Sequence, residues 1–265
     1  MTRPKVNFSR RDLLLTILCT LFALANLGAV GSTSRRRAKE AVCLSNLRQW
    51  GAMFEAYTID NNGYFNRGWD VGETTLWMNA LRPYYAGCET LRFCPEATTL
   101  LTGPSDIRTF TAWWRFISLP EGGEIRDSGS YSINSWTNNM TKDLGSRPMA
   151  WFWKNVNAIK GKANIPVFAD ATWHDAWPKA YDNPPPTGAG WDDFGTSNEM
   201  WNFCIDRHNG AVNHVFMDWS ARKVGFKELW KLKWHRQFNT DGTWTQAGGV
   251  QPTNWPKWMK DFKDY

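Results

Sequence analysis

The side chains best suited to chemistry are four histidines, several aspartates and five cysteines. His208 and His214 are six residues apart on a predicted turn and strand, so they point to the same side only if the strand extends that far. With Asp170, Asp206 and Asp218 they could form a mixed His/Asp metal site. We favour a structural role instead, in which His208 and Asp218 fix a hairpin by hydrogen bonds to its backbone.

The sequence contains no GxSxG, P-loop, dinucleotide-binding, HExxH or paired CxxC motif. These patterns carry the common nucleophilic, phosphate-binding and metal-dependent chemistries. We therefore expect a protein that is not an enzyme, with no catalytic residue, no cofactor and no transition metal.

Calcium is the more physical metal alternative, because it takes six to eight oxygen ligands and a loop rich in carboxylates can wrap around it. Four aspartates lie in or beside a loop over residues 182–195 that contains three consecutive prolines: Asp182, Asp192, Asp193 and Asp206. Their spacing matches no calcium motif, so we favour solvated loop carboxylates over a calcium site.

The cysteines leave two interpretations open. Cys19 lies in an apolar run, and Cys43, Cys88, Cys94 and Cys204 are an even number in the rest of the chain. In an oxidising compartment Cys88 and Cys94 could close a short disulfide loop. Free buried thiols are an equal alternative.

Aromatic residues are unusually frequent, with 18 tryptophans and 15 phenylalanines. We expect more of them than one core needs, so that some lie at the surface against a neighbouring copy or a ligand. Trp173 and Trp177, beside His174, Asp175 and Lys179, are the best pair for stacking on a sugar ring. A surface-anchored carbohydrate-binding protein is therefore the alternative function, with core packing or self-association favoured.

An uncharged run over residues 13–30, LLLTILCTLFALANLGAV, predicts a membrane anchor. As an α-helix it would be roughly 27 Å long, enough for the hydrocarbon core of a bilayer. Basic residues flank it on both sides, so the positive-inside rule does not settle its orientation. The net charge of +6 comes largely from these flanks, which suit lipid headgroups better than nucleic acid.

After the anchor, apolar residues recur at helical spacing from Ala38 to Tyr57, and the pattern stops at the breaker cluster over residues 60–63. We predict short helices over 75–85 and 226–235, strands over 107–117, 131–136 and 165–169, and a turn region over 120–129. Strands over 212–217 and 222–226 form the best hairpin. We expect the tail from Asn239 to be irregular and to pack back onto the body of the domain, and we call it the C-terminal strap. The predicted fold is α+β, a long N-terminal helix packed on an antiparallel sheet.

Two stretches carry a resemblance to a known family: AKEAVCLSNLRQWGAMFEAYTIDNNGYF over residues 38–65 and RHNGAVNHVFMDW over residues 207–219. They resemble the prepilin-type, type II secretion pseudopilin-like proteins of bacteria. The second stretch is similar to that family's C-terminal signature of histidine, nine residues, aspartate and glycine. His208 and Asp218 keep this spacing, and Trp219 replaces the glycine.

The resemblance implies a pilin-like fold and a non-enzymatic role in assembly. It places a processing site at Asn7–Phe8 with its carboxylate at Asp12, although Asn7 replaces the family's glycine, and residues 9–14 also resemble a twin-arginine export signal. The expected organisation is a basic leader-like segment (1–12), an anchor (13–30), a helical spine (31–63) and an extracytoplasmic domain (64–265). The expected location is the inner membrane, single-pass, with a periplasmic or surface-exposed domain. The expected partners are membrane lipid and further copies or other pseudopilins, with polysaccharide as the alternative and no nucleic acid.

Overall fold

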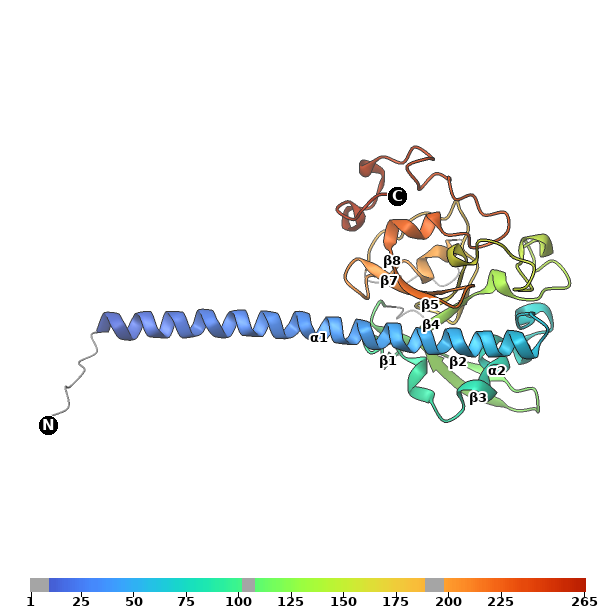
Figure 1. The fold of residues 1–265 in the computed structure, drawn as a ribbon, viewed down its shortest axis with the longest axis horizontal. Helices are drawn as coiled ribbons and strands as arrows, with labels where there is room; N and C mark the ends of the chain where they lie inside the picture. Colours follow the sequence, from blue (N-terminus) through green and yellow to red (C-terminus); the bar gives the residue numbers. More distant parts are fainter. Residues whose placement is uncertain (1–9, 102–107, 189–197) are drawn as a thin grey trace. The chain divides into compact units, whose positions relative to one another are not determined.

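The computed structural model describes residues 10–101, 108–188 and 198–265, with side chains from residue 31 onward except Ser32. It divides into two compact units, Met1–Lys39 and Glu40–Tyr265. Figure 1 shows the fold. The α-helices are α1 (Arg10–Asp60), α2 (Trp77–Ala80) and α3 (Arg82–Tyr85). The strands are β1 (Thr99–Leu100), β2 (Thr111–Ser118), β3 (Glu124–Gly129), β4 (Tyr131–Asn134), β5 (Pro166–Asp170), β6 (Asp175–Ala176), β7 (Ala211–Phe216) and β8 (Ala221–Gly225).

Ten 3₁₀ helices occur among the described residues, and they make up most of the remaining regular structure. They are η1 (Gly68–Asp70), η2 (Glu73–Thr75), η3 (Glu89–Arg92), η4 (Ser135–Thr137), η5 (Met149–Trp151), η6 (Lys162–Asn164), η7 (Glu199–Asn202), η8 (Phe226–Lys231), η9 (Pro252–Asn254) and η10 (Lys257–Met259).

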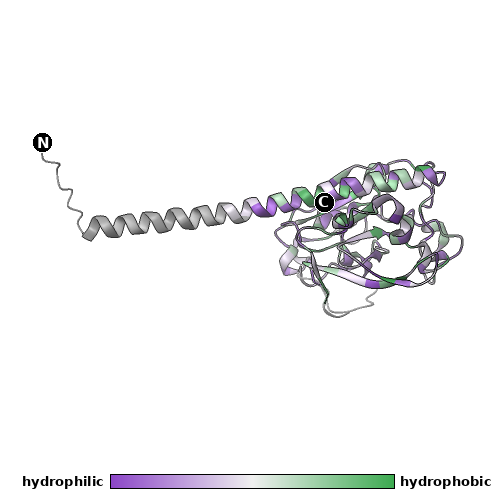
Figure 2. Ribbon diagram, turned by 90° about the horizontal axis from the view of Figure 1, so that it is seen from below, coloured by the Kyte–Doolittle hydropathy of each residue, from purple (hydrophilic) through white to green (hydrophobic). Residues whose placement is uncertain are grey.

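The C-terminal part of α1 is built into the core of the unit Glu40–Tyr265. Cys43, Leu47, Trp50 and Phe54 are all fully buried, at the three- and four-residue spacing of one helix face. The opposite face carries polar side chains, and Figure 2 shows the two kinds alternating along this part of the helix. The Trp50 ring packs against the rings of Trp77 and Phe168, with centroids 5.4 Å and 5.1 Å away.

The helix ends where the sequence predicts, at the breaker cluster after Asp60. Asn62 and Gly63 have φ values of 56° and 82°, and the Gly63 amide donates to the Thr58 carbonyl over 2.7 Å. This is a left-handed helix end of the kind that glycine favours. A Cβ on Gly63 would lie 2.3 Å from Asn157 Nδ2, so any other residue would also have to displace the Asn157 side chain.

Two sheets pack with α1, one of three strands in the order β1-β2-β3 and one of five in the order β6-β4-β5-β7-β8. The prediction of an α+β fold is confirmed, but the sheets are mixed rather than antiparallel. β1 pairs parallel with β2, and β4 pairs parallel with β6. These two-residue strands β1 and β6 lie at sheet edges, and short edge strands of this kind leave no periodic pattern in the sequence.

The predicted hairpin is confirmed, with β7 and β8 pairing antiparallel from Ala211↔Gly225 to Val215↔Ala221. The predicted turn region over 120–129 is wrong in its second half, where β3 pairs with β2. Gly122 and Gly123, with φ values of 97° and 84°, complete the turn early and leave the following residues free to form a strand. The predicted helix over 75–85 is split into α2 and α3, since Pro83 supplies no amide hydrogen to continue the first.

Tryptophans fill this core rather than its surface. Trp191 lies outside the described residues, and none of the other tryptophans is exposed. The surface tryptophans that we expected are therefore only partly exposed, and Trp173 is one of several half-buried examples among the described residues. The physical reason lies partly in the C-terminal strap, whose Trp255 packs 5.6 Å from Trp230 and 5.2 Å from Trp244 and so extends the core.

Candidate functional site: a buried cysteine, aspartate and histidine cluster

Four side chains from distant parts of the chain meet in the interior. We call Cys43, Cys94, Asp170 and His208 the Cys/Asp/His cluster. Cys43 lies on α1, Cys94 follows η3, Asp170 ends β5, and His208 lies in the loop before β7. The two cysteines and Asp170 are 0% exposed and His208 is 3% exposed. Helix periodicity turns Cys43 inward, and the apolar strand β5 carries Asp170 into the core.

The cluster is held together by short contacts between its polar atoms. Cys43 Sγ donates to Asp170 Oδ2 over 3.2 Å, and His208 Nε2 lies 3.1 Å from the same oxygen. Cys94 Sγ is 3.4 Å from His208 Nε2. The potential ligand atoms of the four residues all lie within 4.8 Å of one another.

A second layer of groups fixes Asp170. Arg207 is buried, and its Nη1 lies 3.2 Å from Asp170 Oδ1 and 2.8 Å from the Ser130 carbonyl. The Asn213 amide donates to Asp170 Oδ2 over 3.3 Å, and the Tyr131 hydroxyl donates to Cys43 Sγ over 3.5 Å. The carboxylate therefore has a fixed orientation toward the cysteines and His208.

The members of the cluster differ in the direction in which their pKa values are shifted. Burial raises the pKa of Asp170, but the nearby His208 and Arg207 outweigh it, so the pKa of this carboxyl lies well below its ordinary value. Burial lowers the pKa of His208, and the Asp170 carboxylate outweighs it, raising that pKa to about 10. Burial, the hydrogen bond that Cys43 donates to Cys94 and the Asp170 charge raise the pKa of Cys43. For Cys94, hydrogen bonds with Cys43 and His208 outweigh burial and lower its pKa.

Comparisons with known proteins do not place the chain. No protein-family model, no curated protein and no solved structure matches it. The cluster therefore has to be interpreted from its own geometry.

The signature residues His208, Asp218 and Trp219 separate in space. Asp218 is exposed and caps the β7–β8 turn, where its Oδ1 accepts from the Ser220 amide over 3.1 Å and the Ser220 hydroxyl over 2.6 Å. The hairpin role predicted for Asp218 is thus present. The role predicted for His208 is wrong, because its polar contacts are with Asp170 and Cys94.

The mixed His/Asp site is also different from the prediction. His208 and Asp170 are together, whereas His214 is fully buried elsewhere on β7, its Nδ1 3.3 Å from the Val212 carbonyl. Burial lowers the pKa of His214 to about 4, so it is neutral at physiological pH.

Cys88 and Cys94 are not joined in the structure. All four cysteines from Cys43 onward are free thiols, with Cys88 exposed and the other three buried. Cys88 precedes η3 at the surface and Cys94 follows it in the core, so the short separation in sequence does not bring them together. The sulfur that lies near Cys94 in the structure is that of Cys43.

The aspartates predicted as calcium ligands do not come together among the described residues. Asp192 and Asp193 lie outside them. Asp182 is buried and accepts backbone amides of Lys179 and Met200 over 3.0 Å each, while Asp206 accepts the Gly210 amide over 2.9 Å. Within the described part of the chain, the only group of three or more metal-ligating side chains is the Cys/Asp/His cluster.

The sugar-stacking pair does meet at a cavity of about 470 Å³, which we call the aromatic cavity. Its lining includes Trp173, Trp177, Trp69, Arg115, Arg147, His174, Asp175 and Leu144. The Arg147 guanidinium lies 4.1 Å from the Trp177 ring centre, and Trp69 Nε1 donates to Asp175 over 2.5 Å. Lys179 is not part of the lining.

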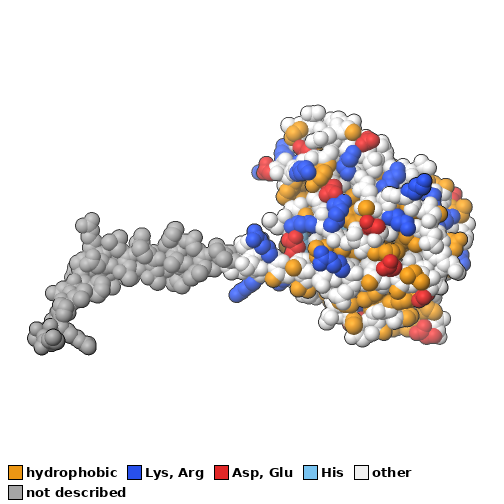
Figure 3. All heavy atoms as spheres, in the orientation of Figure 1, with side chains coloured by type: hydrophobic (Ala, Val, Ile, Leu, Met, Phe, Trp, Pro, Cys, Tyr) orange, Lys and Arg blue, Asp and Glu red, His pale blue; other side chains and the backbone are white. Residues whose placement is uncertain are grey.

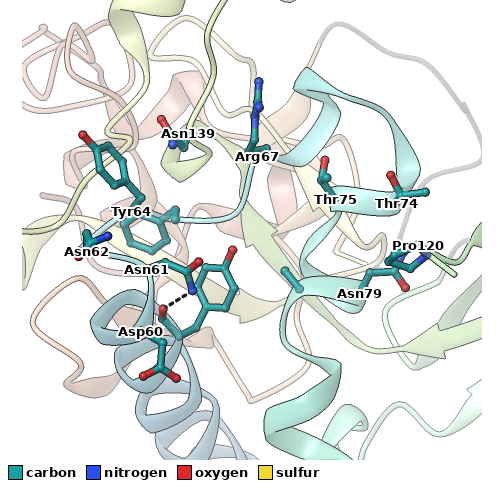
Figure 4. A pocket seen from close by; sticks show the side chains of 13 residues that line it. Asp60, Asn61, Asn62, Tyr64, Arg67, Thr74, Thr75, Asn79, Pro120 and Asn139 are labelled. Atoms are coloured by element: carbon teal, nitrogen blue, oxygen red, sulfur yellow. Dashed lines mark hydrogen bonds between the residues drawn. The ribbon is translucent and has the colours of Figure 1, made fainter.

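A second cavity of about 520 Å³ lies at the C-terminal end of α1. Figure 4 shows its polar lining, in which Asp60 ends the helix, Asn61 and Asn62 follow it, and further residues come from the next segment, namely Arg67, Thr75 and Asn79. Asn61 Nδ2 donates back to the Tyr57 carbonyl over 2.7 Å. Neither this cavity nor the aromatic cavity is lined by a member of the Cys/Asp/His cluster.

The N-terminal predictions fall largely outside what the structure describes. Asn7 and Phe8 lie outside the described residues, as do the side chains of Asp12 and of residues 13–30. A search of the described residues alone finds no helix with the length and hydropathy of a membrane span.

Sequence reasoning missed Cys43 and the way Asp170 is used. Both had a signal: Cys43 continues the apolar helix face of Leu47 and Trp50, and Asp170 directly ends a five-residue buried strand. A polar group in a core position needs a partner there.

Proposed function

We propose that this chain is a non-enzymatic, membrane-anchored, pseudopilin-like structural and assembly protein with a pilin-like fold. One observation carries the proposal: the C-terminal part of the 51-residue α1 supplies four fully buried residues, Cys43, Leu47, Trp50 and Phe54, to the core. An N-terminal anchor attached to such a helix would hold the domain by its core rather than by a flexible linker.

In this proposal the apolar segments 13–30 of neighbouring copies pack together, and Asp12 neutralises a positive group within the low-dielectric bundle. The domain from residue 64 lies in the periplasm or at the cell surface, in a single-pass inner-membrane protein. Its partners are membrane lipid and further copies or other pseudopilins.

The reactive side chains support a non-enzymatic role. Each member of the Cys/Asp/His cluster is at most 3% exposed, so none of them forms an open surface on which a substrate could bind. Figure 3 shows Lys and Arg interspersed with acidic and apolar side chains on one face of the unit Glu40–Tyr265, which does not favour nucleic acid.

Cys88 provides a direct test of topology, because it is the exposed cysteine among those described. Spheroplasts carrying the full chain are treated with a reductant that is then removed, followed by a membrane-impermeant maleimide. We expect labelling of intact spheroplasts, loss of labelling in Cys88→Ser, and recovery of the protein in the membrane fraction. Labelling only after lysis, or a chain found in the soluble fraction, would contradict the proposal.

The second candidate function is carbohydrate binding, favoured by the aromatic cavity. Trp173 and Trp177 line it together, with Asp175 and Arg147 as hydrogen-bonding groups beside them. The Trp177 indole N–H is buried without a hydrogen-bond partner among the described residues, and a sugar hydroxyl could satisfy it after a small side-chain shift.

A glycan array with the detergent-solubilised full chain tests this candidate. Binding that disappears in Trp173→Ala but persists in Trp201→Ala would support it, since both tryptophans are half-buried and only the first lines the cavity. Absence of binding to any glycan would dismiss it and leave the assembly role in place.

A further inference from the structure

We propose that the Cys/Asp/His cluster binds one zinc ion, with Cys43, Cys94, Asp170 and His208 as its four ligands. The ion would be structural, and it would join α1 to three other segments of the unit Glu40–Tyr265. This inference is independent of the assembly role, because it concerns the interior of the domain.

The distances between the potential ligand atoms are close to those between neighbouring ligand atoms in a tetrahedral zinc site. With Zn–S near 2.3 Å and Zn–N or Zn–O near 2.0–2.1 Å, ligand atoms around zinc are roughly 3.4–3.8 Å apart. Cys94 Sγ and His208 Nε2 are 3.4 Å apart, Cys43 Sγ and Asp170 Oδ2 are 3.2 Å apart, and His208 Nε2 and Asp170 Oδ2 are 3.1 Å apart. Outward shifts of a few tenths of an ångström would complete the site.

The charges balance when zinc is counted. Two thiolates and the Asp170 carboxylate carry three negative charges, and Zn²⁺ with the buried Arg207 guanidinium carries three positive ones, while a ligating imidazole is neutral. Arg207 Nη1 lies 3.2 Å from Asp170 Oδ1, which leaves Oδ2 for the metal. A buried site with zero net charge avoids the large cost of an unpaired interior charge.

The ligand types select the metal and its role. Two thiolates and an imidazole suit zinc, whereas calcium and magnesium take oxygen ligands. All four positions are filled by protein side chains, as in structural zinc sites; catalytic zinc keeps an open position. Neighbouring groups also hold the ligands in place. The Tyr131 hydroxyl donates to Cys43 Sγ, and the backbone amide of Asn213 donates to Asp170 Oδ2.

The competing chemistry is a disulfide between Cys43 and Cys94, whose sulfurs lie within the same 4.8 Å cluster. A disulfide would leave two fewer thiols and no thiolate for a metal. Thiol counting and metal content therefore give opposite results for the two cases.

The test uses the full chain purified in detergent under reducing conditions, with Zn²⁺ as the only added ligand. Mass spectrometry of bound metals should find one zinc per chain after removal of excess metal. X-ray absorption should show two sulfur ligands near 2.3 Å and two nitrogen or oxygen ligands near 2.0–2.1 Å. Cys94→Ser and His208→Ala should lose the stoichiometric zinc.

Cys204→Ser is the matched control, because Cys204 is equally buried but lies outside the cluster; it should keep one zinc. If the cluster variants do not fold, cobalt in the unaltered chain decides, since thiolate ligation gives a strong near-ultraviolet charge-transfer band. The proposal is overturned by a chain that takes up no stoichiometric zinc, by zinc retained in Cys94→Ser, or by cobalt without that band. A Cys43–Cys94 disulfide in the peptide map of chain isolated without reductant would also overturn it.

Discussion

Trp219 adopts a backbone conformation that its side chain disfavours. Its φ is 66°, in the left-handed region where residues other than glycine are uncommon, and it stands where the resembled signature has glycine. The turn demands this φ because the chain must rejoin the hairpin at the next residue, where the Phe216 amide donates to the Ser220 carbonyl over 2.9 Å. Packing of the indole 6.3 Å from the Phe65 ring offsets part of the strain.

Two variants separate strain from packing at this position. Trp219→Ala and Trp219→Gly both lose the contact with Phe65, but only glycine relieves the positive φ. We expect the glycine variant to be more stable than the alanine variant by about 1 kcal/mol, the reverse of the usual order. Urea denaturation of both variants measures this difference, and an alanine variant of equal or greater stability would contradict the strain.

Asp182 should make stability depend on pH. Burial raises its pKa to about 7, against an ordinary value of 3.8, despite the amide hydrogen bonds from Lys179 and Met200. Between about pH 4 and pH 7 the folded chain holds a proton that the unfolded chain releases, so this group's contribution to stability falls as pH rises through that window. The upper bound of the effect is roughly 4 kcal/mol.

Asp182→Asn should flatten this slope, because the amide stays neutral and its oxygen can still accept both backbone amides. Urea midpoints at pH 5 and pH 7.5 give the measurement. Asp261→Asn is the control, since Asp261 is exposed and should leave the slope of the parent chain unchanged. Asp175, whose pKa burial also raises to about 7, and the shifted histidines His208, His214 and His235 together set the slope that remains. An unaltered slope in Asp182→Asn would contradict the assignment.

At the scale of elements, the periodicity of apolar residues predicts the long helix and the strands with alternating side chains. The apolar spacing from Ala38 to Tyr57 and the hairpin over 211–225 were both predictable, because each repeats a helix or strand period over several residues. The pairs β1–β2 and β4–β6 were not, since two-residue strands carry no period. The candidate site was predictable only through His208, because the meeting of Cys43, Cys94 and Asp170 depends on tertiary packing.

The buried face of α1 should dominate the stability of the domain. Trp50 is fully buried, packs on three aromatic rings and donates its indole N–H to the Leu91 carbonyl over 2.8 Å. Trp50→Ala should cost about 3–5 kcal/mol in unfolding free energy. Ile59→Ala on the same helix, where the side chain is 71% exposed, should change it by less than about 0.5 kcal/mol. Similar losses in the two variants would mean that α1 does not pack as described.

At the scale of the whole molecule, the chain combines a folded domain with an N-terminal segment that sequence predicts to be a membrane anchor. The domain contributes a core that incorporates α1 from Cys43 to Phe54, and the apolar run 13–30 contributes the surface through which copies would assemble. Assembly through this run is the central claim.

Cys19, within that run, provides the most direct measurement. In membranes that contain the full chain with Cys88→Ser, mild oxidation should produce a disulfide-linked dimer, because packed segments bring Cys19 of neighbouring copies together. The same membranes with Cys19→Ser should give only monomer. A chain that stays monomeric with Cys19 present, at expression levels where the protein is in the membrane, would contradict assembly through residues 13–30.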